Sequence, residues 1–171
     1  MESRVKFLGH PIHPSLIVLP IGLLSMAMLF DLLYVATSNG DLATFSFWAL
    51  IAGISGGLLA AVFGLLDWTS IPTGTRAKAV GLTHGIGNVV VVGLFSVSLA
   101  LRWADPTFLP SLLPVLFSVA GAALALVTAW LGGELVYRMR VGVDDEANLD
   151  ATSSLDQAPR RARTATIHRS S

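Results

Sequence analysis

The sequence is dominated by four continuous apolar stretches, which lie at Ser15–Val35, Thr44–Leu66, Val80–Leu101 and Pro110–Gly133. Each is close to the length of about 20 residues that a helix needs to cross a hydrocarbon layer of ~30 Å. The stretches do not alternate between apolar and polar residues, as the roughly ten-residue strands of a membrane β-barrel do. The sequence therefore predicts an all-α, polytopic membrane protein built as a bundle of four transmembrane helices.

The composition of the chain supports this class and argues against several others. Hydrophobic residues make up 53% of the sequence and charged residues 13%, against ~25% charged residues in soluble domains. The chain contains no cysteine, so we expect no disulfide scaffold, thiolate metal site or cysteine nucleophile. The polar positions offer no set of nucleophile, base and orienting acid, and we favour a role other than that of an enzyme.

Lysine and arginine are distributed unevenly about the four stretches. Ten of the eleven basic residues precede the first stretch, separate the second from the third, or follow the fourth, and only Arg102 lies on the other side. Cytoplasmic loops of membrane proteins are enriched in Lys and Arg. We therefore expect the basic face of the protein, with both termini, to lie in the cytoplasm. The lipid bilayer is the expected partner, and the net charge of zero gives no reason to expect nucleic acid.

The composition changes abruptly after Val143. Residues 1–143 form the predicted membrane domain, whereas residues 144–171 begin with three acidic residues and continue without apolar periodicity. We expect this tail to be disordered and cytoplasmic. Its basic cluster at Pro159–Arg163 either contacts anionic lipid or is simply solvated.

Small residues and one proline predict how the helices pack. Four small residues recur at every fourth position of the last stretch, a pattern that allows another backbone to approach closely: Gly121, Ala125, Ala129 and Gly133. We expect this stripe to face the interior of the bundle. Pro20 lies inside the first stretch, where we expect a kink or a locally opened turn near Gly22.

Ionisable residues within membrane spans are costly and are therefore candidates for function. Most of them gather at the predicted cytoplasmic ends of the spans, where every span contributes at least one: His10, His13, Asp67, His84 and Glu134. Asp31 alone lies in the opposite leaflet, and Glu134 has a favourable spacing for an ion pair with Arg138. If the protein has a chemical site of its own, the sequence places it in the cytoplasmic layer.

The histidines carry the most specific signals. His10 and His13 each precede a proline, which predicts an extended, semi-rigid turn ahead of a helix that begins near Ser15. Imidazoles held in this way lose less entropy on binding a metal ion or haem iron; alternatively, His13 caps the helix and His10 lies among the lipid headgroups. His84 shares a helical face with Asn88, and it either has a functional role or makes an interhelical hydrogen bond.

Several short motifs together resemble one bacterial family. They are Gly9-His10-Pro11-Ile12-His13-Pro14, Pro20-Ile21-Gly22, Asp31, Gly64-x-x-Asp67, His84, and Gly132-Gly133-Glu134-Leu135-Val136-Tyr137 with Val141-Gly142-Val143. From Phe7 to Val143 the chain resembles the predicted membrane proteins catalogued as domain of unknown function twenty-two thirty-one. The resemblance implies a four-span membrane domain and no established activity. Members often carry a histidine after the Leu-Val-Tyr segment, where this sequence has Met139, a residue that can itself ligate haem iron.

Two classes of function fit these observations. In the first, the protein is a small helical-bundle scaffold or partner subunit, either a homo-oligomer or assembled with a redox or transport partner. In the second, it binds a b-type haem or a metal ion non-covalently through His10, His13 and His84. The residues expected around those ligands are Asp67, Asn88, Glu134, Tyr137 and Met139. A transporter is disfavoured because the midplane of the predicted spans is nearly free of charge.

Overall fold

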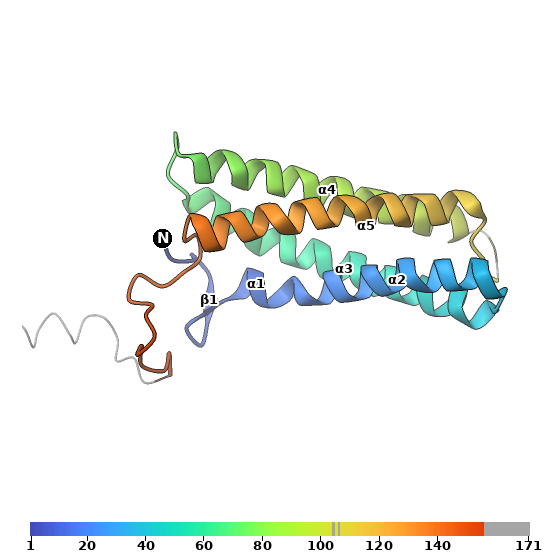
Figure 1. The fold of residues 1–171 in the computed structure, drawn as a ribbon, viewed down its shortest axis with the longest axis horizontal. Helices are drawn as coiled ribbons and strands as arrows, with labels where there is room; N and C mark the ends of the chain where they lie inside the picture. Colours follow the sequence, from blue (N-terminus) through green and yellow to red (C-terminus); the bar gives the residue numbers. More distant parts are fainter. Residues whose placement is uncertain (104, 106, 156–171) are drawn as a thin grey trace, which may run out of the picture.

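The computed structural model describes residues 1–103, 105 and 107–155. Its long helices run side by side along one axis, and the N-terminus and the last described residues lie at the same end (Figure 1). In chain order the elements are β1 (Lys6–Phe7), β2 (His10–Pro11), α1 (Ile12–Leu16), α2 (Val18–Thr37), α3 (Gly40–Ser70), α4 (Arg76–Trp103), α5 (Leu112–Gly133) and the π-helical turn η1 (Glu134–Arg138).

Four helical segments are long and apolar enough to cross a membrane: Ile12–Thr37, Gly40–Ser70, Arg76–Trp103 and Leu112–Arg138. They confirm the prediction of an all-α fold with four spans. Each segment is longer than the apolar stretch that predicted it. α3 begins ahead of its apolar stretch because Asn39 caps it, accepting a hydrogen bond of 3.1 Å from the backbone N–H of Asp41.

The first span is interrupted one turn before its proline. α1 ends at Leu16 and α2 begins two residues later, with Ile17 between them. The ring of a proline clashes with the carbonyl group four residues earlier, and for Pro20 that carbonyl belongs to Leu16. The kink or opened turn expected near Gly22 is therefore wrong in position, because the interruption lies ahead of the proline and α2 continues through Gly22.

The bundle consists of two helical hairpins. The most extensive helix contacts are those of α2 with α3 and of α4 with α5, and we call these pairs hairpin 1 (residues 12–70, including α1) and hairpin 2 (residues 76–133). A small core joins the hairpins and is formed by Leu24, Ala27, Leu50, Val91 and Phe95. Many other leucine and valine side chains point outward, as expected of helices that lipid surrounds.

The small-residue stripe of α5 faces the interior only in part. Gly121 is buried against Phe95, and a Cβ atom at this glycine would lie 2.9 Å from the phenyl ring. Ala129 is exposed, and the buried Thr128 takes the interior position instead. Four residues turn about 400° around an α-helix, so a strict four-residue repeat drifts off the interior face. The expectation of an inward-facing stripe is wrong for Ala129.

The two ends of the described chain are tied together beside α1. Lys6 of β1 lies 3.7 Å from the carboxylate of Asp144, and the hydroxyl of Ser154 donates to the carbonyl of Leu8 at 3.0 Å. The remainder of the predicted tail, including its basic cluster, lies outside the described residues. The domain boundary after residue 143 and the disorder of the tail stay predictions.

Candidate functional site

His84 lies in a hydrogen-bond network between α4 and α5. Its Nδ1 is 2.8 Å from the carbonyl oxygen of Thr128, and because a carbonyl only accepts, Nδ1 carries the proton. Its Nε2 then accepts from the side-chain amide of Asn88 at 3.1 Å, and that amide oxygen accepts from the Thr128 hydroxyl at 3.0 Å. A Cβ atom at Gly132 would lie 3.1 Å from the imidazole, so this glycine makes room for the ring. One of the two expectations for His84, an interhelical hydrogen bond, is confirmed.

His13 makes an equivalent contact between α1 and α3. Its Nδ1 lies 2.8 Å from the carbonyl oxygen of Ala60, which assigns the proton to Nδ1 by the same reasoning. The ring rests on Gly64, where a Cβ atom would lie 2.8 Å from it. Because α1 begins at Ile12, His13 lies in a helical turn, and the extended backbone expected at this residue is wrong. The side chain also makes no capping bond; it ties α1 to α3 instead.

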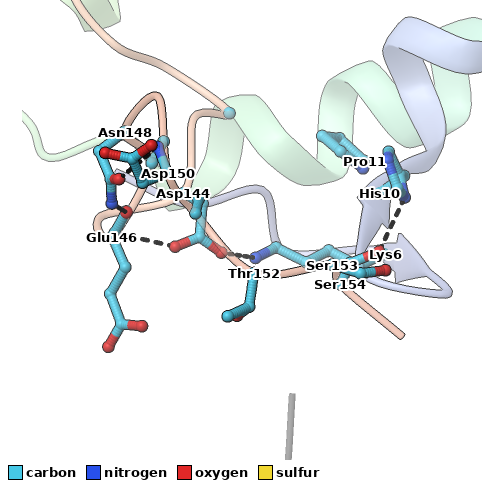
Figure 2. Close-up of a pocket in the computed structure, with 14 residues that line it drawn as sticks. Lys6, His10, Pro11, Asp144, Glu146, Asn148, Asp150, Thr152, Ser153 and Ser154 are labelled. Atoms are coloured by element: carbon cyan, nitrogen blue, oxygen red, sulfur yellow. Dashed lines mark hydrogen bonds and ion pairs between the residues drawn. The ribbon is translucent and has the colours of Figure 1, made fainter. Parts of the chain in front are cut away.

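His10 lies on β2, outside the spans. It lines an open hollow of about 600 Å³ between the N-terminal strands and the segment that follows η1. Figure 2 shows His10 among the residues that line this hollow. Its exposed ring is 3.2 Å from the carbonyl of Leu8 and 3.5 Å from the hydroxyl of Ser154. Within the part of the chain that the structure describes, no three His, Cys, Asp or Glu side chains gather as a metal site requires. His10, His13 and His84 therefore form no such group.

Asp67 fastens the N-terminal segment to the end of α3. Its carboxylate accepts a hydrogen bond of 2.7 Å from the hydroxyl of Ser3 and one of 2.8 Å from the backbone N–H of Arg4. These contacts use both carboxylate oxygens, since the Ser3 hydroxyl also lies 2.8 Å from the second one. The role that the geometry gives Asp67 is to hold the chain terminus against the bundle.

Glu134, Tyr137 and Met139 lie where the last span ends. Glu134 forms an exposed ion pair of 3.4 Å with Arg76 at the start of α4, in place of the pair with Arg138 that its spacing predicted. Tyr137 is 85% exposed, and the backbone N–H of Met139 bonds to the carbonyl of Glu134 at 3.2 Å. Exposed ion pairs contribute only about 0–1 kcal/mol, so this pair adds little to stability.

The opposite end of the bundle, which we call the distal end, holds a fully buried charged pair. Asp31 of α2 and Arg102 of α4 have side chains with 0% exposure. They form two parallel hydrogen bonds of 2.9 Å, one from each terminal guanidinium nitrogen to each carboxylate oxygen. Three buried serine hydroxyls complete the cluster, so that all four spans contribute to it: Ser46 from α3, Ser98 from α4 and Ser118 from α5.

Every N–H of the Arg102 guanidinium has an acceptor. Besides the two bonds to Asp31, it donates to the carbonyl and the hydroxyl of Ser98 at 3.3 Å and 2.9 Å and to the hydroxyl of Ser46 at 3.2 Å. Asp31 also accepts from Ser118 at 3.0 Å. The desolvation of a buried ion pair is offset only when its remaining donors and acceptors are satisfied. The described side chains leave no buried nitrogen or oxygen without a partner, which meets that condition.

The sequence pattern did not predict the distal cluster. Asp31 was expected to stand alone in its leaflet, and this expectation is wrong because Asp31 pairs there with Arg102. A signal was available, because the one acid in that leaflet and the one base on that side have opposite charges and lie on different spans. The serines gave no comparable signal, since small hydroxyl residues are common in membrane helices.

Comparison with known proteins identifies one family. Residues 9–145 match the family model described as "Predicted membrane protein (DUF2231)". The matched segment contains all four spans, the half-buried His13 and His84, and the whole distal cluster. No curated protein and no solved structure matches the chain.

Proposed function

The chain belongs to the DUF2231 family of predicted membrane proteins, and we propose that it is a membrane scaffold or partner subunit and not an enzyme. The observation that carries this proposal is that the polar groups of the spans bond to one another. Asp31 and Arg102 bond across the distal end, and His13 and His84 each bond to a backbone carbonyl of a neighbouring helix. Groups engaged in this way hold helices together in lipid. A partner, whether a second copy or a redox or transport protein, would contact the lipid-facing helix surfaces.

The proposed location is the bacterial cytoplasmic membrane, with both termini in the cytoplasm. The positive-inside rule supports this orientation, because Arg102 is the one basic residue of the described chain at the distal end. Its charge is neutralised by Asp31, so it does not oppose the rule.

Cysteine labelling tests the orientation, since the natural chain has no cysteine and gives no background. Ser38 lies in the distal loop between α2 and α3, and Thr73 lies in the loop between α3 and α4. In intact cells, a membrane-impermeant maleimide should label Ser38→Cys and should label Thr73→Cys only after the membrane is opened. The reverse pattern would overturn the proposed orientation.

Alanine substitution of the two half-buried histidines, His13 and His84, tests the scaffold role. Each change removes one hydrogen bond between helices, which in membrane proteins contributes about 0.6 kcal/mol on average and up to ~1.7 kcal/mol. We expect His13→Ala with His84→Ala to lower the free energy of unfolding by about 1–3 kcal/mol and to change nothing else. The exposed His10 supplies the control, since His10→Ala should leave the stability unchanged. Loss of an activity or an optical spectrum at unchanged stability would contradict the proposal.

A second candidate function, binding of a b-type haem or a metal ion, has one observation in its favour. The carbonyls of Ala60 and Thr128 fix Nδ1 of His13 and His84, an outer contact that commonly orients ligating imidazoles and leaves Nε2 for the iron. Two axial imidazoles are sufficient for haem. The side chain of Asn88 would first have to leave Nε2 of His84.

Haem or metal binding would use His13 and His84 as the pair of ligands, and not the three histidines that the sequence suggested. Expression with added haem, followed by absorption spectroscopy, tests it. Haem ligation predicts a Soret band that His84→Ala abolishes and His10→Ala retains. Loss of the band in the His10→Ala protein alone would exclude the proposed pair.

A further inference from the structure

Hairpin 1 has a regular set of contacts between its two helices. The imidazole of His13 rests on Gly64, and its Nδ1 bonds to the carbonyl of Ala60, four residues before that glycine. Further along, the side chain of Leu24 rests on Gly53, where a Cβ atom would lie 2.7 Å from it. Both contacts place a large side chain of the first helix on a glycine of the second.

Hairpin 2 has the same set of contacts. The imidazole of His84 rests on Gly132, and its Nδ1 bonds to the carbonyl of Thr128, again four residues before the glycine. Further along, the ring of Phe95 rests on Gly121 at 2.9 Å from the position of a Cβ atom. The order, spacing and partners of the contacts therefore repeat between the hairpins.

The equivalent residues are separated by constant numbers of positions. On the first helix of each hairpin the offset is 71, both from His13 to His84 and from Leu24 to Phe95. On the second helix the offset is 68 for each of the three equivalent pairs, Gly53 with Gly121, Ala60 with Thr128, and Gly64 with Gly132. A fixed offset along each helix means that both hairpins pack in the same register. We infer that the chain is a tandem repeat of one helical hairpin, in which the opposite charges of Asp31 and Arg102 determine which hairpins pair. We call this pairing rule the charge code.

The charge code follows from the place of the two residues in the repeat. Asp31 and Arg102 are also 71 positions apart, so they occupy the same site in the two hairpins, and they meet each other across the bundle at 2.9 Å. If two copies of hairpin 1 paired in this geometry, aspartate would face aspartate, and two copies of hairpin 2 would bring arginine against arginine. A buried charge without an opposite partner is strongly unfavourable. Opposite charges thus favour pairing of hairpin 1 with hairpin 2 and reject pairing of like hairpins.

Two of the three hydroxyls around the pair, those of Ser98 and Ser118, show that the two repeats have specialised. By the same offsets, Ser98 corresponds to Ala27 and Ser118 corresponds to Leu50, and all four residues are fully buried. The packing positions are shared, but these hydroxyls are present only in hairpin 2. Exchange of the two charges would therefore keep the attraction and lose part of the hydrogen bonding.

Charge reversal in the full-length chain tests the code, with oligomeric state measured by light scattering in detergent. Asp31→Arg alone and Arg102→Asp alone bring like charges together, and we expect each to lose the wild-type oligomeric state and aggregate. The double exchange Asp31→Arg with Arg102→Asp restores opposite charges, and we expect the wild-type state with a lower melting temperature. As a control, Arg76→Glu creates like charges at the exposed pair with Glu134 and should leave the state unchanged.

Co-expression of the two single variants under different tags gives a second readout. One chain then carries arginine in both hairpins and the other carries aspartate in both, so opposite charges are available only between chains. We expect a soluble mixed complex that either tag captures, where each variant alone aggregates. The code is overturned if a single variant keeps the wild-type state, if the double exchange aggregates like the single variants, or if co-expression yields no mixed complex.

Discussion

Replacement of Arg102 by methionine should strongly destabilise the protein. The substitution removes the five hydrogen bonds of the guanidinium and leaves the buried carboxylate of Asp31 with the hydroxyl of Ser118 as its remaining donor. Loss of one partner from a buried ion pair costs about 3–5 kcal/mol, because the other charge is left uncompensated. The total stability of a typical domain is only about 5–15 kcal/mol, so this loss would remove a large share of it.

Equilibrium unfolding in detergent micelles, followed by helical circular dichroism, measures this loss. Addition of Asp31→Asn to Arg102→Met removes the uncompensated charge, so the double variant should be more stable than Arg102→Met alone. Arg76 supplies the matched control, since its side chain is 70% exposed and its loss should cost about 0–1 kcal/mol. If Arg102→Met destabilises the protein no more than Arg76→Met does, the distal pair does not anchor the bundle.

Two further predictions concern a helix contact and a loop. Gly64→Ala should push the His13 ring off the Ala60 carbonyl and lower the free energy of unfolding by about 1–3 kcal/mol, measured by thermal or chemical unfolding. Gly85 supplies the control, because the space at its Cβ position is open and Gly85→Ala should not destabilise the protein. Equal effects of the two substitutions would contradict the close contact between His13 and Gly64. The hydroxyl and backbone N–H of Thr107 hold the pKa of Asp105 below its usual value. This interaction stabilises the loop at higher pH and is lost as the pH falls through that lowered pKa. Thr107→Val should therefore raise the pKa of Asp105 in an NMR titration, and an unchanged pKa would refute the assignment.

The fold could be predicted from the sequence because only α-helices and closed β-barrels can span a membrane. Apolar stretches of the required length predicted four spans, and the spans are present. Their ends were less accurate; α3, for instance, begins at its Asn39 cap and not at the start of the apolar stretch. The family resemblance read from the short motifs is confirmed by the match over residues 9–145.

The partners of the polar residues were harder to predict for two physical reasons. His13 and His84 bond to backbone carbonyls, and every residue has such a group, so the sequence does not mark the acceptor. Glu134 pairs with Arg76 from another span, whereas spacing arguments apply only within one helix. The pairing of Asp31 with Arg102 could have been predicted, because these two residues are 71 positions apart, as are His13 and His84.

The absorption spectrum and metal content of the purified wild-type protein, expressed with added haem, test the central claim most directly. The claim is that the polar groups of the spans hold the bundle together and do not carry a cofactor. The scaffold account predicts no Soret band, no change between the reduced and oxidised spectra, and no stoichiometric metal. A Soret band or one bound metal ion per chain, lost in the His84→Ala variant at unchanged stability, would contradict it.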